Sequence, residues 1–302
     1  MTIRVLIGYD GSPAASAAID AGAHLFPHTG AWIAHLWTPP FASTSLRHRL
    51  GKGTTNLNDF VAALEREGRR EADRLADTGV ALARAAGWDA EPVVVRSYSG
   101  EGLQLAELAE EKDADVLLVG SRGLGGARAV LGSSSDLAVH YATRPVLVIP
   151  HPLLIDEYAA LADGPVLVGY DASAGSKVAL AAAAQMFPTR RLLQVTVDDG
   201  DVTDDPADSL PTGHTMVTEL HLSGAHGPTG RAVAAALAGC ARNHNAAMVV
   251  VGSRGRSALR EILLGSVAMA TLHHAHRPVL VIPPTTRETL QGIRPDDGAS
   301  PR

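Results

Sequence analysis

Four landmarks occur twice in this sequence, in the same order, and this internal repeat constrains the fold more than any other feature. Phe26-Pro27 returns as Phe187-Pro188, 161 residues later. IRVLIGYDGS at Ile3–Ser12 matches PVLVGYDAS at Pro165–Ser173, and DVLLVGSRG at Asp115–Gly123 matches AMVVVGSRG at Ala247–Gly255. The fourth landmark, RPVLVIP, occurs unchanged at Arg144–Pro150 and at Arg277–Pro283. This period is far too long for a solenoid, so we expect two globular units of related structure.

Short apolar runs alternate with helical patterns throughout both units. Val5–Tyr9 is a continuous apolar run, typical of a parallel strand that is buried on both faces. Ser12 and Pro13 then provide an N-cap and a first-turn proline for the helix Ala14–Leu25. Regular alternation of strand and helix predicts a parallel α/β sheet with right-handed crossovers.

The expected elements follow the repeat. In the first unit, strands are expected at Val5–Tyr9, Trp32–Trp37, Pro92–Arg96, Val116–Gly120 and Pro145–Ile149, and helices at Ala14–Leu25, Leu57–Ala86, Leu103–Lys112 and Ser133–Ala142. In the second, strands are expected at Val166–Gly169, Leu192–Val197, Glu219–Leu222, Met248–Gly252 and Pro278–Ile282, and helices at Ser176–Met186, Gly230–Asn243 and Ser266–His274.

The second unit is shorter than the first. The offset between them falls from 161 at the first strand to 132 at the glycine loop, so the second unit lacks 29 residues and the long helix after its second strand. We expect domains at 1–150 and 165–285, joined by a linker at 151–164 with a short helical stretch. Residues 286–302 hold Gly, Pro, Asp and Ser with little apolar content, and are expected to be disordered.

Composition narrows the classes of function. The net charge of −6 and the lack of a Lys/Arg cluster argue against nucleic-acid binding. Cys240 is the single cysteine, so no intramolecular disulfide or cysteine-based metal site is expected. We expect its side chain to be buried. No apolar run approaches the ~20 residues that span a membrane, and no signal-peptide pattern precedes Ile3. We expect a cytoplasmic protein that contacts no membrane.

The glycine loops point to a ligand site. Val249–Ser266 combines a strand, a glycine-containing loop and a helix start, where backbone N–H groups and the helix dipole favour an anion such as phosphate. A single such loop is better explained by an ordinary tight turn, but the stretch occurs in both units. Asp10 and Asp171 end the first strand of each unit, where an Asp suits a ribose hydroxyl or a divalent cation, or serves as a turn residue. Neither a Walker A nor a G-x-G-x-x-G pattern is present, which argues against a kinase, a P-loop NTPase or an ordinary dinucleotide enzyme.

At these residues the sequence resembles the universal stress protein family in its tandem-domain form. The ATP-binding branch of that family carries Gly, two residues, Gly, nine residues, Gly, and then Ser or Thr; Gly252, Gly255, Gly265 and Ser266 match this spacing. The resemblance implies two tandem doubly wound, Rossmann-like α/β domains, each a five-stranded parallel sheet of order 3-2-1-4-5 with helices on both faces. It implies ATP as the cofactor, with Mg²⁺ accompanying the nucleotide as an open alternative.

The resemblance also implies roles for single residues in the second unit. Asp171 and Val197 would lie near the adenine and ribose, and Gly252 and Gly255 along the ribose and first phosphate. The outer phosphates would lie against the start of the last helix, with Arg254 as a charge partner. The full candidate set is Gly169, Asp171, Ser173, Val197, Gly252, Ser253, Arg254, Gly255, Gly265, Ser266 and Val267.

The first unit departs from the family spacing. Only eight residues separate Gly123 from Gly132, although Leu124-Gly125-Gly126 is flexible enough to absorb the deletion. The matching candidates are Gly8, Asp10, Ser12, Leu36, Gly120, Ser121, Arg122, Gly123, Gly132, Ser133 and Ser134. Because one unit has a short loop and the other lacks a helix, we expect unequal binding.

Three functions remain open at this stage. The resemblance implies a regulator of stress response or dormancy that acts through nucleotide-dependent interactions, forms a homodimer and has a protein partner not yet identified. The alternatives are a weak ATPase or nucleotidyl-transferring enzyme on the same fold, and a scaffold that binds no nucleotide. No nucleophile–base pair stands out, so no catalytic residue is assigned, and slow ATP hydrolysis is left open. His273, His274 and His276 do not share one helix face, so no metal site is expected. The apolar strands ending each unit are expected to pair with each other or with another chain.

Overall fold

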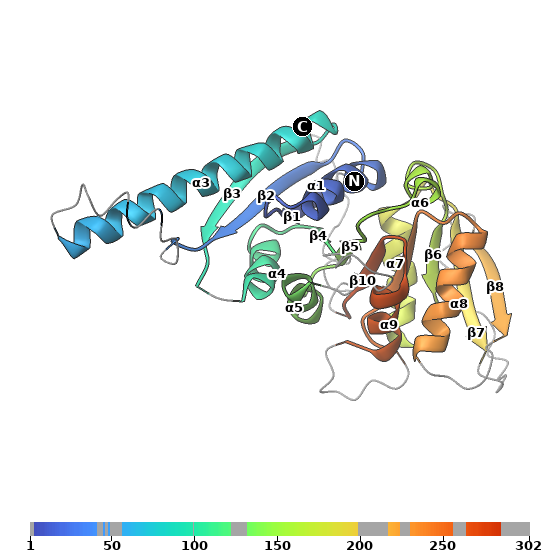
Figure 1. Cartoon of the computed structure of the whole chain (residues 1–302). Coiled ribbons are helices and arrows are strands. Elements are labelled where there is room, and N and C mark those ends of the chain that lie inside the picture. The colour runs from blue at the N-terminus through green and yellow to red at the C-terminus, as the bar shows by residue number, and fades with distance from the viewer. Residues whose placement is uncertain are drawn as a thin grey trace, which may run out of the picture.

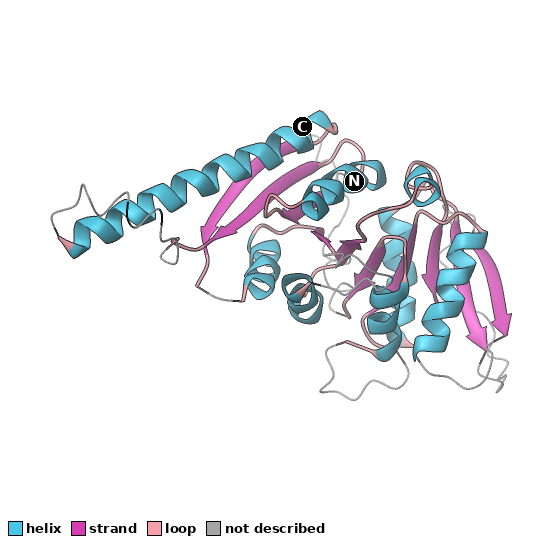
Figure 2. Ribbon diagram, in the orientation of Figure 1, coloured by secondary structure: helices cyan, strands magenta, loops and turns pink. Residues whose placement is uncertain are grey.

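A computed structural model of the chain describes residues 3–40, 45, 48, 56–98, 100–121, 132–198, 217–223, 230–255 and 264–284. Strands and helices alternate along this part of the chain, except that no described helix separates the strands at Leu192–Asp198 and Val217–Ser223 (Figures 1 and 2). The α/β class expected from the sequence is therefore confirmed. The tail after residue 284 lies outside the described residues, so the expectation of disorder there is not tested.

The first unit has nine described elements, in the expected order. They are β1 (Arg4–Gly8), α1 (Pro13–Leu25), β2 (Gly30–Trp37), α3 (Leu57–Ala85), β3 (Asp89–Arg96), α4 (Glu101–Glu111), β4 (Val116–Gly120), α5 (Ser133–Tyr141) and β5 (Val146–Ile149). Strand β3 begins three residues before the expected start, and contains Pro92. Proline is tolerated there because β3 is an edge strand of the sheet.

The second unit repeats this order after a short linker helix, α6 (Ile155–Ala159). Its described elements are β6 (Val166–Gly169), α7 (Ala174–Met186), β7 (Leu192–Asp198), β8 (Val217–Ser223), α8 (Gly230–Asn243), β9 (Met248–Gly252), α9 (Ser266–His274) and β10 (Val279–Ile282). Strands β7 and β8 pair in parallel, as a crossover requires. The crossover itself, 199–216, lies outside the described residues, so the expected loss of the long helix is not tested.

The strands of both units form one continuous sheet. Its order is β3-β2-β1-β4-β5-β10-β9-β6-β7-β8, which contains the expected order 3-2-1-4-5 twice (Figure 1). The units join where β5 and β10 pair antiparallel, with Leu147 opposite Leu280. These two leucines are equivalent positions of the repeat. The junction therefore has two-fold pseudosymmetry, and the two last strands pair within one chain.

Helices cover both faces of this sheet (Figure 2). Residues of α1, α3 and α7 pack into the apolar core on one face, and residues of α4, α5, α8 and α9 into the core on the other. The four strand residues Val5, Leu6, Leu117 and Leu118 are fully buried between the two cores. A parallel strand covered on both faces has to be apolar throughout, which explains why the sequence shows continuous runs rather than alternation.

Two serines explain how a helix start comes to follow the first strand of each unit. Ser12 and Ser173 lie in extended backbone before α1 and α7, and each hydroxyl accepts a hydrogen bond from a backbone N–H in the first turn. Each cap starts a helix directly after the first strand of its unit. The carboxyl ends of β1 and β6 are therefore each followed within a few residues by a helix N-terminus.

The sequence also led to expectations about the single cysteine and about the length of the apolar helices. Cys240 is buried in α8, as expected, and burial raises the pKa of its thiol. Among the described helices, none is both long and apolar enough to span a lipid bilayer.

Candidate functional site

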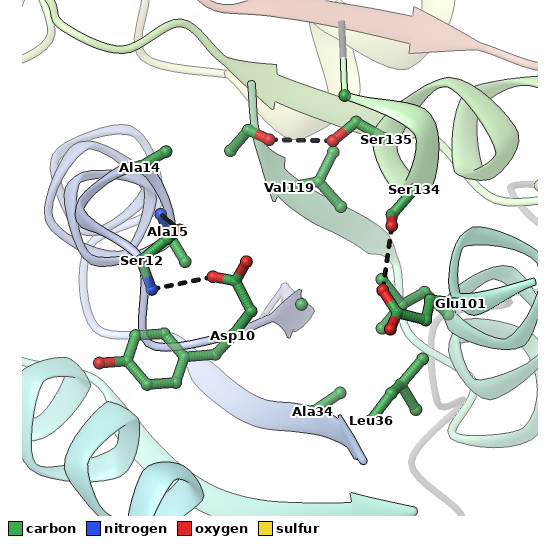
Figure 3. A pocket seen from close by; sticks show the side chains of 15 residues that line it. Asp10, Ser12, Ala14, Ala15, Ala34, Leu36, Glu101, Val119, Ser134 and Ser135 are labelled. Atoms are coloured by element: carbon green, nitrogen blue, oxygen red, sulfur yellow. Dashed lines mark hydrogen bonds between the residues drawn. The ribbon is translucent and has the colours of Figure 1, made fainter. Parts of the chain in front are cut away.

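A cavity of about 150 Å³ opens at the carboxyl ends of β1, β2 and β4 in the first unit (Figure 3). Its wall includes seven of the residues expected at a site from the sequence: Gly8, Asp10, Ser12, Leu36, Gly120, Gly132 and Ser134. The other lining residues are Tyr9, Ala14, Ala15, Ala34, Glu101, Leu105, Val119 and Ser135. Residues from five separate segments thus meet where strand order reverses, the usual ligand position in open α/β sheets.

One wall of this cavity is the turn between β1 and α1. Asp10 Oδ1 accepts a hydrogen bond from the Ser12 N–H at 2.9 Å, and Ser12 Oγ accepts one from the Ala15 N–H at 3.1 Å (Figure 3). The Ser12 hydroxyl is therefore engaged in capping α1. Asp10, an exposed residue, is left as the acidic group on this side.

The opposite wall contains an ionisable residue that the sequence did not suggest. Ser134 Oγ donates a hydrogen bond to Glu101 Oε2 at 3.1 Å, which joins the first turns of α4 and α5 (Figure 3). The two residues are 33 positions apart and belong to different motifs, so only the folded chain reveals the pair. Among the described residues that line the cavity, Asp10 and Glu101 are the charged ones, and both are acidic.

Close backbone approach explains the glycine at the end of β4. A Cβ on Gly120 would lie 2.6 Å from the Ala14 carbonyl oxygen, so no side chain fits between β4 and α1. In the second unit, a Cβ on Gly252 would lie 2.7 Å from the carbonyl oxygen of Gly175. The first glycine of each loop is thus required by packing, whether or not a ligand binds.

The serine after this glycine has a structural role in both units. Ser121 is buried; its N–H donates to the Ile149 carbonyl oxygen, and its Oγ accepts from the His151 N–H. Ser253 is also buried, and its N–H donates to the Ile282 carbonyl oxygen. Ser121 and Ser133 are not among the residues lining the first cavity. The expected site residues Arg122 and Gly123 lie outside the described residues.

The glycine loop of the second unit is closed by its own backbone. The Gly265 N–H donates to the Ser253 carbonyl oxygen at 2.7 Å, which brings the two ends of the loop together across 256–263. Helix α9 starts immediately afterwards, with Gly265 as its N-cap, no side-chain capping bond and no acidic residue in its first turn. Its start is therefore an electropositive helix end without a protein carboxylate in that turn.

Asp171 lies beside this loop. Its Oδ1 accepts a hydrogen bond from the Ser173 N–H at 3.0 Å, which orients the carboxylate. A Cβ on Gly255 would lie 3.0 Å from Asp171 Oδ2, so the carboxylate directly adjoins the exposed glycine. Two residues 84 positions apart are thereby brought together.

The remaining candidates of the second unit surround the same edge. Arg254 has a buried Nε atom with no hydrogen-bond partner among the described residues, so this donor can still be satisfied by an added acceptor. Val197 is half-buried against the second core, and Gly169 faces Leu237 of α8. A Cβ on Gly230 would lie 2.8 Å from the Ser266 carbonyl oxygen, so the starts of α8 and α9 are in contact, near Val267.

Within the described part of the chain, no group of three or more His, Cys, Asp or Glu side chains could hold a metal ion. Of the described residues, Asp10 and Glu101 are the carboxylates that line the first cavity, and Asp171 is the carboxylate beside the second loop.

Comparison with protein families shows what this arrangement is similar to. The model of the universal stress protein family matches residues 1–150 and 164–283. Universal stress protein Rv2623 of Mycobacterium tuberculosis is 28% identical over 96% of this chain and 98% of its own length. A universal stress protein of Mycolicibacterium smegmatis is 32% identical, and the match spans 57% of this chain and 63% of that relative.

Solved structures agree on the fold. A universal stress protein from Archaeoglobus fulgidus covers 93% of this chain and 98% of its own, with 19% identity and a TM-score of 0.64. A universal stress protein solved in complex with cAMP covers 49% of this chain and 97% of its own, with 24% identity and a TM-score of 0.35. The tandem arrangement of two Rossmann-like domains is shared with the Archaeoglobus fulgidus protein along nearly the whole chain.

Proposed function

The chain belongs to the universal stress protein family, and on that premise we propose that it binds ATP at the glycine loop of its second unit. The observation that carries the proposal is the start of α9. It follows a glycine N-cap, has no capping side chain and has no acidic residue in its first turn. Such a helix end stabilises a phosphate through backbone N–H groups and the helix dipole.

The residues around this helix start fit a nucleotide. The carboxylate of Asp171 beside Gly255 suits a ribose hydroxyl, and Val197 provides apolar surface for a base. The unpartnered Nε of Arg254 supplies a donor for phosphate oxygens. Gly265, Ser266 and Val267 would hold the outer phosphates through their backbone, with Mg²⁺ bound to those phosphates rather than to a protein cage.

We further propose that other macromolecules recognise whether a nucleotide is bound to this protein. Rapid turnover of the nucleotide is not part of this function. The protein would act as a cytoplasmic regulator, as a homodimer or with a protein partner. Because β5 and β10 pair within one chain, an assembly of two chains would have to use a surface other than these strands. We retain the domain division expected from the sequence, 1–150 and 165–285, in which each domain is one unit of the nucleotide-binding type.

A glycine substitution tests the ATP proposal directly. Gly255→Val adds a branched side chain to an exposed loop position beside Asp171, and should abolish binding of ATP with Mg²⁺ in isothermal titration calorimetry. Asp171→Asn keeps an acceptor for the Ser173 N–H while removing the charge, and should weaken binding. Gly30→Val is the matched control, since a Cβ on Gly30 meets nothing within 4 Å. Unchanged ATP affinity in Gly255→Val would contradict the proposal.

A further inference from the structure

The two ligand-binding edges differ at one pair of positions that the repeat makes comparable. Gly8 and Gly169 are equivalent, and they face Leu105 of α4 and Leu237 of α8 respectively. This common contact aligns the two helices and places Val233 at the position of Glu101. Counting from the glycine N-caps of α5 and α9 likewise places Val267 at the position of Ser134.

Two valines in the second unit thus occupy the positions of a hydrogen-bonded polar pair in the first unit. Glu101 and Ser134 join the starts of α4 and α5 through the 3.1 Å hydrogen bond. Val233 and Val267 are both half-buried and pack against the same apolar core. The second unit therefore leaves the start of α9 without a nearby acidic group from α8 at this position.

The first unit places its own anion at the corresponding helix end. The Ser134 hydroxyl holds the Glu101 carboxylate against the first turn of α5, beside the electropositive helix end that would attract a phosphate. A phosphate that entered would also face like-charge repulsion from Glu101. Asp10 is a second carboxylate among the described residues of this wall.

From this difference we propose that Glu101 is a specificity-determining residue that restricts the first cavity to nucleosides without a phosphate chain. The inference rests on the proposed function, because it assumes that the repeat recognises adenine and ribose in both units. Asp10 and Leu36 line the first cavity at the positions of Asp171 and Val197, so the base and sugar are met by similar surfaces. The phosphate end is where the units differ.

The experiment uses the full chain with its second site blocked by Gly255→Val. Adenosine, AMP and ATP with Mg²⁺ are titrated calorimetrically into this variant and into the same variant carrying Glu101→Val or Glu101→Gln. With Glu101 present, ATP should bind at least about tenfold more weakly than adenosine. Each substitution should raise ATP affinity about tenfold while changing adenosine affinity by less than about twofold. Glu107→Gln, which neutralises an exposed carboxylate elsewhere on α4, should change neither.

Equal affinities for adenosine and ATP with Glu101 present would overturn the inference, as would unchanged ATP affinity after both substitutions. A first cavity that takes no nucleoside in any variant would overturn it too. Tight ATP binding that depends on Mg²⁺ and is lost in Glu101→Gln would instead show that Glu101 recruits the cation, and would also contradict the proposal. These results are separable from the proposed function, which fails if the unsubstituted chain binds no ATP or if Gly255→Val leaves its ATP affinity unchanged.

Discussion

Phe26 of the first unit stacks on Phe187 of the second, with ring centroids 5.2 Å apart and planes 29° from parallel. The two rings are equivalent positions of the repeat, and each follows the last residue of a helix, α1 or α7. Together with Leu147 opposite Leu280 in the sheet, they place equivalent residues in contact across one pseudo-two-fold axis. The repeat is therefore joined by a symmetric, buried junction rather than by the linker alone.

Truncating one ring at this junction should destabilise the whole chain. Phe187 is 3% exposed, so Phe187→Ala should lower the free energy of unfolding by about 3–5 kcal/mol through lost burial and a cavity. Urea denaturation followed by circular dichroism measures the change. Phe187→Leu, which retains most of the volume, should cost clearly less. A loss below about 1 kcal/mol for the alanine variant would mean that the stack does not hold the units together.

Arg190 should act as a second link between the units. Its guanidinium donates hydrogen bonds to the carbonyl oxygens of Gly164, Leu161 and His24, and burial lowers the pKa of its guanidinium. Lysine cannot reproduce this planar set of donors, so Arg190→Lys should cost about 1–3 kcal/mol in urea denaturation. Arg191→Lys, at the exposed neighbouring position, is the control and should be near neutral. Equal effects of the two substitutions would rule out the link.

The linker helix should show a pH-dependent contact with α1. The Tyr158 hydroxyl donates to Asp20 Oδ2 at 2.7 Å, and this hydrogen bond raises the pKa of Tyr158 from about 10 to about 12. The contribution to stability is fully present below pH 10, where the unfolded chain also keeps the proton, and is lost as pH rises through 12. The stability difference between the unsubstituted protein and Tyr158→Phe should therefore shrink over this window. Tyr98→Phe, at a highly exposed ring, should show no such trend; a constant difference for Tyr158→Phe would contradict the assignment.

Replacing Asp113 with asparagine gives the first unit the residue that the second unit has at the equivalent position, Asn245, and tests what the charge of Asp113 contributes to stability. The two residues have positive φ values of 51° and 48°, a conformation that both residue types tolerate. Hydrogen bonds from Arg4 and Arg144 lower the pKa of Asp113 in the folded chain. The charge of Asp113 therefore stabilises the fold at any pH above the pKa that this residue has in the unfolded chain. That stabilisation is lost as pH falls through the pKa of the folded chain. Because Asp113 is largely exposed, Asp113→Asn should cost less than about 1 kcal/mol at pH 7 and nothing in acid. A cost that persists unchanged in acid would point to the backbone rather than the charge.

The sequence predicts the framework well because the repeat supplies each motif twice. The order of strands and helices and the place of the glycines at the strand ends follow from patterns that lie within short segments. Whether the last strands pair within or between chains could not be decided from the sequence, because both arrangements bury the same apolar edge. The structure resolves this through the pairing of Leu147 with Leu280.

Contacts between distant segments account for what the sequence missed. Glu101 lies at the start of a helix, where an acidic residue is ordinary, and only folding brings it to Ser134. Ser121 and Ser253 look like ligand residues because they belong to the glycine motif. The backbone N–H groups of both serines pair with the last strand of each unit, at Ile149 and Ile282, which the sequence did not indicate.

The most direct test of the account is the number of ATP molecules bound per chain. Equilibrium dialysis of the full-length protein against ATP with Mg²⁺ should give one ATP per chain, held by the second unit. That value should fall to zero in Gly255→Val and remain one in Gly30→Val. No bound ATP, or one ATP per chain retained in Gly255→Val, would contradict the claim that the loop closed by Gly265 and Ser253 is the nucleotide site.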